Sequence, residues 1–289
     1  MLPAGAEPIR VLHLSDLHMA PWQRDKQAWV RSLAELEPDL IVDTGDNLGH
    51  ERGIEGVRRA FDAFAGIPGV FVNGSNDYFG PAVKNPFTYF GGPSGVIARA
   101  KRLDIGELHA YFAELGWHDL DNTAASLDLR GTHFEFFGVD DPHRGYDRLD
   151  LITAAIDELR AEDPLGDEVW PDAASASLPR PTVTVGVTHA PYQRVLNSFV
   201  NHGAQLVLAG HTHGGQVCVP GFGSLVTNEL STRWYGAWAT PTVTVGRRSP
   251  TTDATSGHSS SPSGSSARAD PRSPWASPTR RTSACSTPS

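Results

Sequence analysis

The chain has 289 residues, two cysteines and a formal net charge of −9. This length allows one large domain or two small ones with a sizeable core. Two cysteines exclude the disulfide framework of a small secreted protein and suit a reducing compartment. The acidic balance argues against nucleic acid as a partner, because backbone phosphates require a basic surface. The sequence has neither a signal peptide nor an apolar run of about 18 residues, so we expect a cytoplasmic protein without stable membrane insertion.

Five short apolar runs are predicted to be β-strands. They cover residues 9–14, 40–42, 70–72, 183–187 and 206–208. The runs are rich in β-branched residues and nearly continuous rather than alternating, which is typical of strands covered on both faces.

Amphipathic segments separate these strands. Apolar residues recur at helical spacing over 26–36, 56–64, 105–115, 149–159 and 192–200. A middle section alternates apolar and polar residues on both sides of Gly131-Thr132, which predicts a β-hairpin over residues 124–139. Alternating strands and helices with an inserted hairpin indicate an α/β layered domain.

Three segments lack such patterns. Residues 80–102 are rich in glycine, proline and aromatic residues and are predicted to form a loop over one face, and residues 166–181 a polar surface connection. Residues 246–289 contain no Val, Ile, Leu, Phe or Met and are dominated by Ser, Thr, Pro and Arg. Such a segment buries too little apolar surface to offset its ordering entropy. We therefore expect one domain over 1–245 and a disordered tail over 246–289.

Acid, amide or imidazole groups follow all five predicted strands. In chain order these residues are Asp16, His18, Asp46, Asn76, Asp77, His189, His211 and His213. Ligands of open α/β sheets bind outside the carboxyl ends of the strands. The sequence Gly210-His211-Thr212-His213-Gly214 is the most informative segment, because two imidazoles on a glycine-flanked turn can face two adjacent metal ions. A metal cluster at this edge is the simplest explanation.

This ordered set resembles the calcineurin-like metallophosphoesterase family, whose pattern is D-x-H, G-D, G-N-H-[DE], H and G-H-x-H. The resemblance covers about residues 9–245, and the following Gly214-Gly215-Gln216 is similar to the YkuE-type bacterial branch. It implies a layered αββα sandwich with mixed β-sheets. It also implies two metal ions bridged by the Asp46 carboxylate. The first site would be completed by Asp16, His18 and His213, and the second by Asn76, His189 and His211.

The resemblance further implies a reaction. Two divalent or trivalent ions (Mn, Fe or Zn) would clamp a phosphoryl oxygen and activate a hydroxide that attacks phosphorus. The expected function is hydrolysis of a phosphomonoester, phosphodiester or pyrophosphate bond in a small phosphorylated substrate. The alternatives are a non-catalytic metal-binding interaction scaffold of the same fold and a nuclease, which the acidic balance disfavours.

The third motif departs from the family pattern. An alignment without gaps places Ser75 on the metal-binding Asn and Asn76 on the His that protonates the leaving group. An alignment on the Asn places Asp77 on that His. We favour Asn76 as the ligand, because a carboxamide oxygen is a better metal donor than a neutral hydroxyl.

In either alignment the family's general acid is missing. His143, in the sequence Asp140-Asp141-Pro142-His143, and His50 are the substitutes we can name. The predicted catalytic groups are therefore Asp46, Asn76, Asp77 and His143. Without a proton donor, catalysis would favour leaving groups of low pKa.

The other histidines are predicted to have no catalytic role. His13 lies within the first predicted strand and is expected to pack in the interior. His109, His118 and His133 are expected on the surface.

The end of the chain is a second departure. Related phosphoesterases continue beyond G-H-x-H with further strands, whereas the apolar pattern here stops after residues 242–245. The tail composition resembles an out-of-frame reading of a GC-rich gene. We therefore expect a replaced C-terminus and one uncovered sheet edge.

Overall fold

The computed structural model of the chain describes residues 6–80, 100–162, 182–213, 217–219 and 223–226. The predicted connection over 166–181, the tail over 246–289 and the last apolar run over 242–245 lie outside the described residues. Most of the predicted loop over 80–102 lies outside them as well.

The first sheet contains four parallel strands in the order β1, β2, β3, β4. Their bounds are Val11–Leu14, Leu40–Asp43, Gly69–Phe71 and Trp117–Asp119. The first three confirm the predicted strands, and every residue of β2 and β3 is buried. β4 was not predicted, because its first residue is its only buried one and no apolar run marks it.

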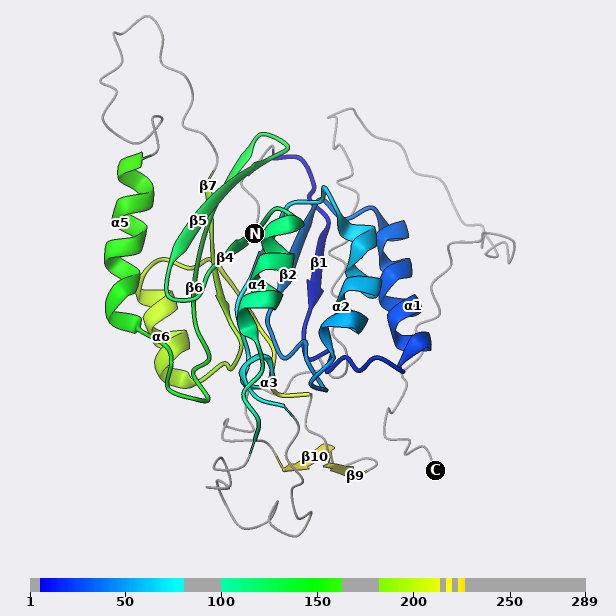
Figure 1. Cartoon of the computed structure of the whole chain (residues 1–289). Helices are drawn as coiled ribbons and strands as arrows, with labels where there is room; N and C mark the ends of the chain where they lie inside the picture. Colours follow the sequence, from blue (N-terminus) through cyan, green and yellow to red (C-terminus); the bar gives the residue numbers. More distant parts are fainter. Residues whose placement is uncertain (1–5, 81–99, 163–181, 214–216, 220–222, 227–289) are drawn as a thin grey trace, which may run out of the picture.

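The helices of the first half of the chain cover the outer face of this sheet (Figure 1). They are α1 (Arg24–Ser32), α2 (Ile54–Phe61) and α4 (Ile105–Glu114), with the short helices η1 (Leu33–Leu36) and η2 (Asp62–Phe64) continuing α1 and α2. The four-residue helix α3 (Ser75–Tyr78) lies near the carboxyl end of β3.

The second sheet contains β5, β6, β7 and β8 in that order. Their bounds are Ala124–Leu129, Thr132–Val139, Thr182–Thr188 and Leu206–Ala209. β5 and β6 form the predicted antiparallel hairpin, and the other two pairs are parallel. This sheet is therefore mixed, as expected.

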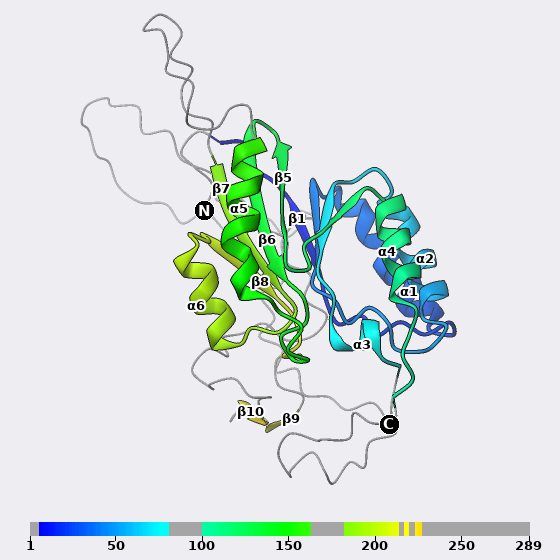
Figure 2. The ribbon, with the colours of Figure 1, turned by 60° about the vertical axis from the view of Figure 1, so that its left-hand side comes forward.

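The outer face of the second sheet is covered by α5 (Ile152–Glu162), which follows η4 (Leu149–Leu151), and by α6 (Gln193–Asn201). Figure 2 shows the resulting order of layers from helices through two sheets to helices. A small antiparallel pair, β9 (Val217–Val219) and β10 (Gly223–Val226), lies apart from both sheets. The architecture confirms the predicted αββα sandwich.

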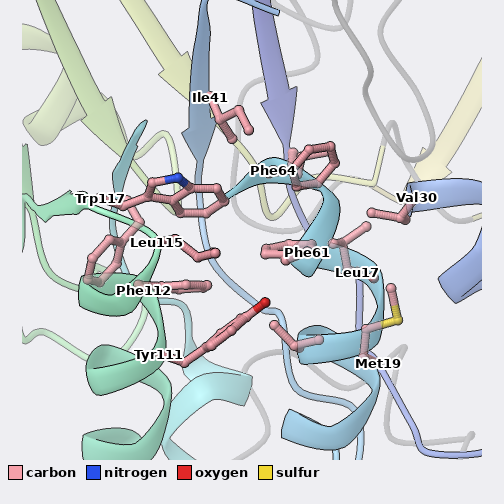
Figure 3. Packing of buried hydrophobic residues seen from close by; sticks show 14 of the residues in the cluster. Leu17, Met19, Val30, Ile41, Phe61, Phe64, Tyr111, Phe112, Leu115 and Trp117 are labelled. Atoms are coloured by element: carbon pink, nitrogen blue, oxygen red, sulfur yellow. The ribbon is translucent and has the colours of Figure 1, made fainter. Parts of the chain in front are cut away.

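Three apolar clusters correspond to the three spaces between these layers. The cluster under α1, α2 and α4 is aromatic: the rings of Phe112 and Trp117 stack at 5.1 Å, and Phe61 packs against both (Figure 3). The cluster between the sheets is mainly aliphatic, and that under α5 and α6 includes an edge-on contact between Phe137 and Phe199. Burial of this much apolar surface is the main stabilising contribution to such a fold.

Among the described residues, no helix combines the length and the apolar character that crossing a bilayer requires.

Candidate metal centre

The loops that follow strands of both sheets meet at one edge of the sandwich. Backbone hydrogen bonds join the loop after β1 to the loop after β2, from Asp16 N to Gly45 O and from His18 N to Asp46 O, both at 2.9 Å. The two sheets are joined by the His189 imidazole, whose Nδ1 lies 2.7 Å from the carbonyl oxygen of Thr44. Residues that are far apart in the sequence are thus brought to one place.

The first group of potential ligands contains Asp16, His18 and His213. His213 Nε2 lies 3.2 Å from Asp16 Oδ1 and 3.3 Å from His18 Nε2. The two imidazole rings are stacked, with centroids 5.3 Å apart. All three ligand atoms face a common point.

The second group contains Asp46, His189 and His211. His189 Nε2 lies 3.5 Å from Asp46 Oδ1 and 3.2 Å from His211 Nδ1. His189 is completely buried, and Asp46 is almost so.

Asp46 lies between the two groups. Its Oδ1 faces His189, whereas its Oδ2 lies 3.8 Å from His18 Nε2 in the first group. One carboxylate therefore directs one oxygen to each group, which is the arrangement a bridging ligand requires.

The backbone of the centre is unusual. Eight non-glycine residues of the described chain have a positive φ, and five of them are predicted ligands. These five are Asp16 (54°), His18 (41°), Asp46 (58°), His211 (67°) and His213 (46°). Each such conformation costs about 1 kcal/mol or more and persists where the surrounding structure holds it, often at functional sites.

Two glycines allow the loops to approach this closely. A Cβ on Gly74 would lie 2.7 Å from the Asp46 amide nitrogen and 2.8 Å from His189 Cε1. A Cβ on Gly210 would lie 2.7 Å from Asp16 Oδ2 and would collide with the Ser15 hydroxyl. The glycines of the sequence motifs therefore provide space between elements.

Asn76 lies against the central carboxylate. Its backbone amide donates to Asp46 Oδ1 at 2.8 Å, and its side-chain Nδ2 donates to Asp46 Oδ2 at 2.6 Å. In this orientation the amide nitrogen, rather than the oxygen, faces Asp46. Ser75 instead donates its hydroxyl to Asp141.

Asp77 is surrounded by backbone amides. Its completely buried carboxylate accepts backbone N–H bonds from Asp46 (2.8 Å), Asn47 (2.8 Å), Leu48 (3.2 Å) and Gly74 (3.0 Å). Burial and the Asp46 charge raise the pKa of Asp77 to about 8. These contacts hold the turn that carries Asp46, and the catalytic role of Asp77 stays a prediction.

His143 lies at the exposed rim of the centre. Its ring centroid is 4.8 Å from that of His211, and its Nδ1 lies 2.9 Å from the Tyr192 hydroxyl. His50 packs edge-on against Trp22 at 4.8 Å instead. Of the two substitutes considered for the proton donor, the structure brings His143 to the ligand groups.

The charges of the two carboxylates dominate the electrostatics of the centre. Although burial opposes it, the Asp46 and Asp16 carboxylates raise the pKa of His189 to about 9. Burial and the charge on His189 lower the pKa of His211 to about 3. Against the effect of burial, the neighbouring imidazoles of His213 and His189 hold the pKa of Asp16 below its usual range. The centre therefore attracts positive charge.

The residues fit metal ions. Asp16 Oδ1 is buried and has no hydrogen-bond partner, which is costly unless a cation is nearby. Imidazole nitrogens face each other across 3.2 and 3.3 Å, a distance that is favourable only with a proton or a cation between the lone pairs. Carboxylate and imidazole donors suit Mn, Fe or Zn.

A second polar cluster was not predicted. His109, which we expected on the surface, is half-buried beside Asp119 and Asp121, and together they form a third group of potential metal ligands. The Asn73 amide lies 2.7 Å from His109 Nε2 and also donates to Asp121. No apolar run precedes Asp119 and Asp121, because β4 has only one buried residue, so the sequence did not mark this cluster as the end of a strand.

Three predictions about other histidines can be compared with the structure. His13 is buried, as expected, with its Nε2 2.9 Å from Thr44 Oγ1. His118 is exposed, as expected. The prediction for His133 was wrong, because its ring is buried in β6 and its Nδ1 lies 2.8 Å from Asp128 Oδ1.

Comparison with known proteins agrees with this arrangement. The family described as calcineurin-like phosphoesterase matches residues 9–215. The chain is 24% identical over 225 residues to the uncharacterized protein YpbG of Bacillus subtilis (strain 168), covering 76% of this chain and 66% of that protein, just under two thirds.

Two solved structures are also similar. One is the crystal structure of TT1561 of Thermus thermophilus, with a TM-score of 0.38, 16% identity, and coverage of 70% of this chain and 81% of that one. The other has a TM-score of 0.40, 16% identity, and coverage of 71% and 84%. We base no conclusion on likeness at this level.

Proposed function

The chain belongs to the calcineurin-like phosphoesterase family, and we propose that it is a phosphohydrolase with a binuclear metal centre bridged by Asp46. The observation that carries this proposal is the position of the Asp46 carboxylate, with Oδ1 3.5 Å from His189 Nε2 and Oδ2 3.8 Å from His18 Nε2. Asp16, His18 and His213 would hold one ion, and Asn76, His189 and His211 the other.

Bound there, two divalent or trivalent ions (Mn, Fe or Zn) would polarise a phosphoryl oxygen and make hydroxide available near neutral pH. The protein's part is to hold the ligands in place. Asp77 fixes the turn that carries Asp46 through three backbone hydrogen bonds from that turn. A rotation of the Asn76 carboxamide by 180° would turn its oxygen toward an ion held by Asp46.

His143 is our candidate for protonating the leaving group. In the imidazolium form, Nδ1–H donates to the Tyr192 hydroxyl and Nε2–H, on the other side of the ring, is available to the leaving group, so that transfer of this proton leaves a neutral imidazole. The ring lies beside His211 at the exposed rim, where a leaving group can depart. A donor at this place would replace the histidine that the third motif lacks.

The proposed substrate is a small phosphorylated molecule with a phosphomonoester, phosphodiester or pyrophosphate bond, hydrolysed in the cytoplasm. Metal ions bound at the centre would supply local positive charge for an anionic substrate. The net charge of −9 of the whole chain disfavours nucleic acid as the substrate. A competing function is a metal-binding interaction scaffold, which is favoured by Asn76 at or beside the place of the motif histidine.

The test uses manganese-loaded protein and phosphate esters that differ in leaving-group pKa. We expect turnover of bis(p-nitrophenyl) phosphate, and we expect His143→Ala to slow phenyl phosphate at least tenfold more than p-nitrophenyl phosphate, since a poor leaving group needs the proton. His118→Ala, an exposed histidine on β4, is the matched control. Full metal occupancy without turnover of any ester would favour the scaffold.

A further inference from the structure

We propose that Arg144, stacked on Phe79 beside the metal centre, binds a second acidic group of the substrate. The ligand class is a diphosphate, in which one phosphoryl group reacts at the centre and the other meets this guanidinium. The inference rests on the proposed phosphohydrolase function and narrows its substrate class.

The first evidence is the state of the guanidinium itself. Its Cζ lies 4.5 Å from the centroid of the Phe79 ring. The Nε and Nη1 atoms of Arg144 are buried and have no hydrogen-bond partner. Within the described part of the chain, no carboxylate pairs with it. Burying N–H donors of a charged group without acceptors is unfavourable, so an acidic oxygen from outside the chain would satisfy them once the side chains that cover them shift.

Two other arginines that lie over aromatic rings show the difference. Arg58 lies 4.4 Å from the Tyr111 ring and is paired with Glu114 at 2.9 Å. Arg194, 5.9 Å from the Tyr192 ring, donates to both carboxylate oxygens of Asp147. The stack of Arg144 is therefore similar to the other two, except that its acidic partner is missing.

The loop that carries Arg144 is anchored to the metal centre. Ser75 of α3 donates to one oxygen of Asp141, and the other oxygen accepts the His143 amide at 2.8 Å. The Arg144 amide donates to the Asp141 carbonyl at 3.2 Å, which closes the turn. The turn thus presents His143 toward His211 and places Arg144 one residue further along the rim.

Phe79 is fixed from the other side. It directly follows α3, which carries Asn76, and it forms an antiparallel bridge with Arg102. Side chains of directly opposed residues lie on the same face, so the exposed Arg102 side chain shares a face with the Phe79 ring. The Arg144 guanidinium stacks on this ring, and the Arg102 side chain starts from the residue opposite Phe79.

The distribution of charge favours a diphosphate over a simple ester. The metal centre accounts for one phosphoryl group. A neutral leaving group would offer no acidic oxygen to the guanidinium of Arg144, whereas the second phosphoryl group of a diphosphate would. A planar guanidinium can bind two phosphate oxygens at once, which a lysine ammonium cannot reproduce.

The experiment compares two inorganic probes. Calorimetric titrations measure the affinities of pyrophosphate and orthophosphate for the manganese-loaded protein, at a fixed concentration of free manganese, and for the chelator-treated protein. We expect wild type to bind pyrophosphate at least tenfold more tightly than orthophosphate. Arg144→Gln should reduce this ratio to about 2 or less, and Arg144→Lys should give an intermediate ratio. Arg58→Gln is the matched control and should keep the wild-type ratio.

Each outcome decides the matter. An unchanged ratio in Arg144→Gln, or an equal loss for both probes, would overturn the inference. If Arg144→Gln does not fold, the Arg144→Lys ratio decides instead: a wild-type ratio contradicts the proposal. An Arg144-dependent preference without turnover of any ester would uphold this subsite and refute the phosphohydrolase. Turnover of an ester without an Arg144-dependent preference for pyrophosphate would refute this subsite and uphold the phosphohydrolase.

Discussion

The metal centre and the cluster around His109 contain the same types of side chain, and both lie where strands end. In the metal centre, imidazole nitrogens and carboxylate oxygens face each other across 3.2–3.8 Å, and Asp16 Oδ1 has no hydrogen-bond donor. In the His109 cluster imidazole nitrogens also face carboxylate oxygens, at 3.3 and 3.9 Å, and Asn73 Oδ1 is buried without a hydrogen-bond partner, but the Asn73 amide nitrogen lies between these groups and contacts both His109 and Asp121. The difference teaches that ligand types alone do not make a cation site.

The two clusters also balance their charge differently. In the metal centre, Asp46 and Asp16 raise the pKa of His189 to about 9 and so attract a positive charge. In the other cluster, burial and the Asp119 and Asp140 carboxylates raise the pKa of Asp121 well above its usual range. Burial thus favours the neutral form of one carboxyl group in the second cluster, whereas the first is arranged for cations.

The strongest test of this contrast replaces one carboxyl group of each cluster with an amide. We expect Asp46→Asn to lose at least one manganese ion per chain and all hydrolytic activity, because the bridge between the two ligand groups is gone. Asp121→Asn should keep the manganese content of wild type. Elemental analysis of the purified variants measures both. An equal loss in the two variants would contradict the contrast.

The next test concerns space rather than charge. Gly74→Ala should destabilise the fold by about 3 kcal/mol and lower manganese affinity, since its Cβ would meet Asp46 and His189. Gly66→Ala is the matched control: its φ is +83° but its Cβ would meet nothing within 4 Å, so we expect about 1 kcal/mol and normal metal binding. Urea unfolding measures the difference, and a smaller effect at Gly74 than at Gly66 would refute it.

A third test uses a buried group beneath the metal centre. Burial lowers the pKa of His13 from 6.5 to about 4. The unfolded chain therefore takes up a proton first, and the stability that a neutral His13 provides is complete above pH 6.5 and is lost as the pH falls toward 4. We expect wild type to lose up to about 3 kcal/mol relative to His13→Gln over this range. Parallel pH profiles of the two unfolding free energies would contradict this.

The smallest effect is expected at Asp121, with the opposite sign. Since the folded pKa is raised, the unfolded chain ionises first as the pH rises above 3.8, and the folded state loses stability. Asp121→Asn should remove this loss and be more stable than wild type by about 1 kcal/mol at pH 8, with the difference vanishing near pH 3.5. Thermal unfolding at the two pH values measures it, and a variant that is less stable at pH 8 would refute the interpretation.

Much of the fold was predictable because apolar periodicity reports burial on one or two faces. The continuous runs at β2 and β7 mark strands covered on both faces, and the alternation across Gly131-Thr132 marks a hairpin. β4 was missed because only Trp117 of its three residues is buried. A strand that short is held by its neighbour β3 rather than by its own sequence.

The sequence allowed us to predict which residues form the candidate site, but not what each of them contacts there. Because Asp16, Asp46 and His189 each follow a predicted strand, we expected them at one site. The structure places them in two groups of potential metal ligands. The contacts of Asp77 depend on three amides of a distant turn, which no spacing in the sequence reveals. The position of Arg144 depends on a stack with Phe79, 65 positions earlier in the chain (144 − 79).

The most direct test of the central claim is the number of manganese ions bound per chain, measured by elemental analysis on the same sample that is assayed with bis(p-nitrophenyl) phosphate. A binuclear centre bridged by Asp46 predicts two ions and turnover in wild type, and the loss of at least one ion and of all turnover in Asp46→Asn. A single ion per chain, or two ions that remain in Asp46→Asn with full turnover, would contradict it.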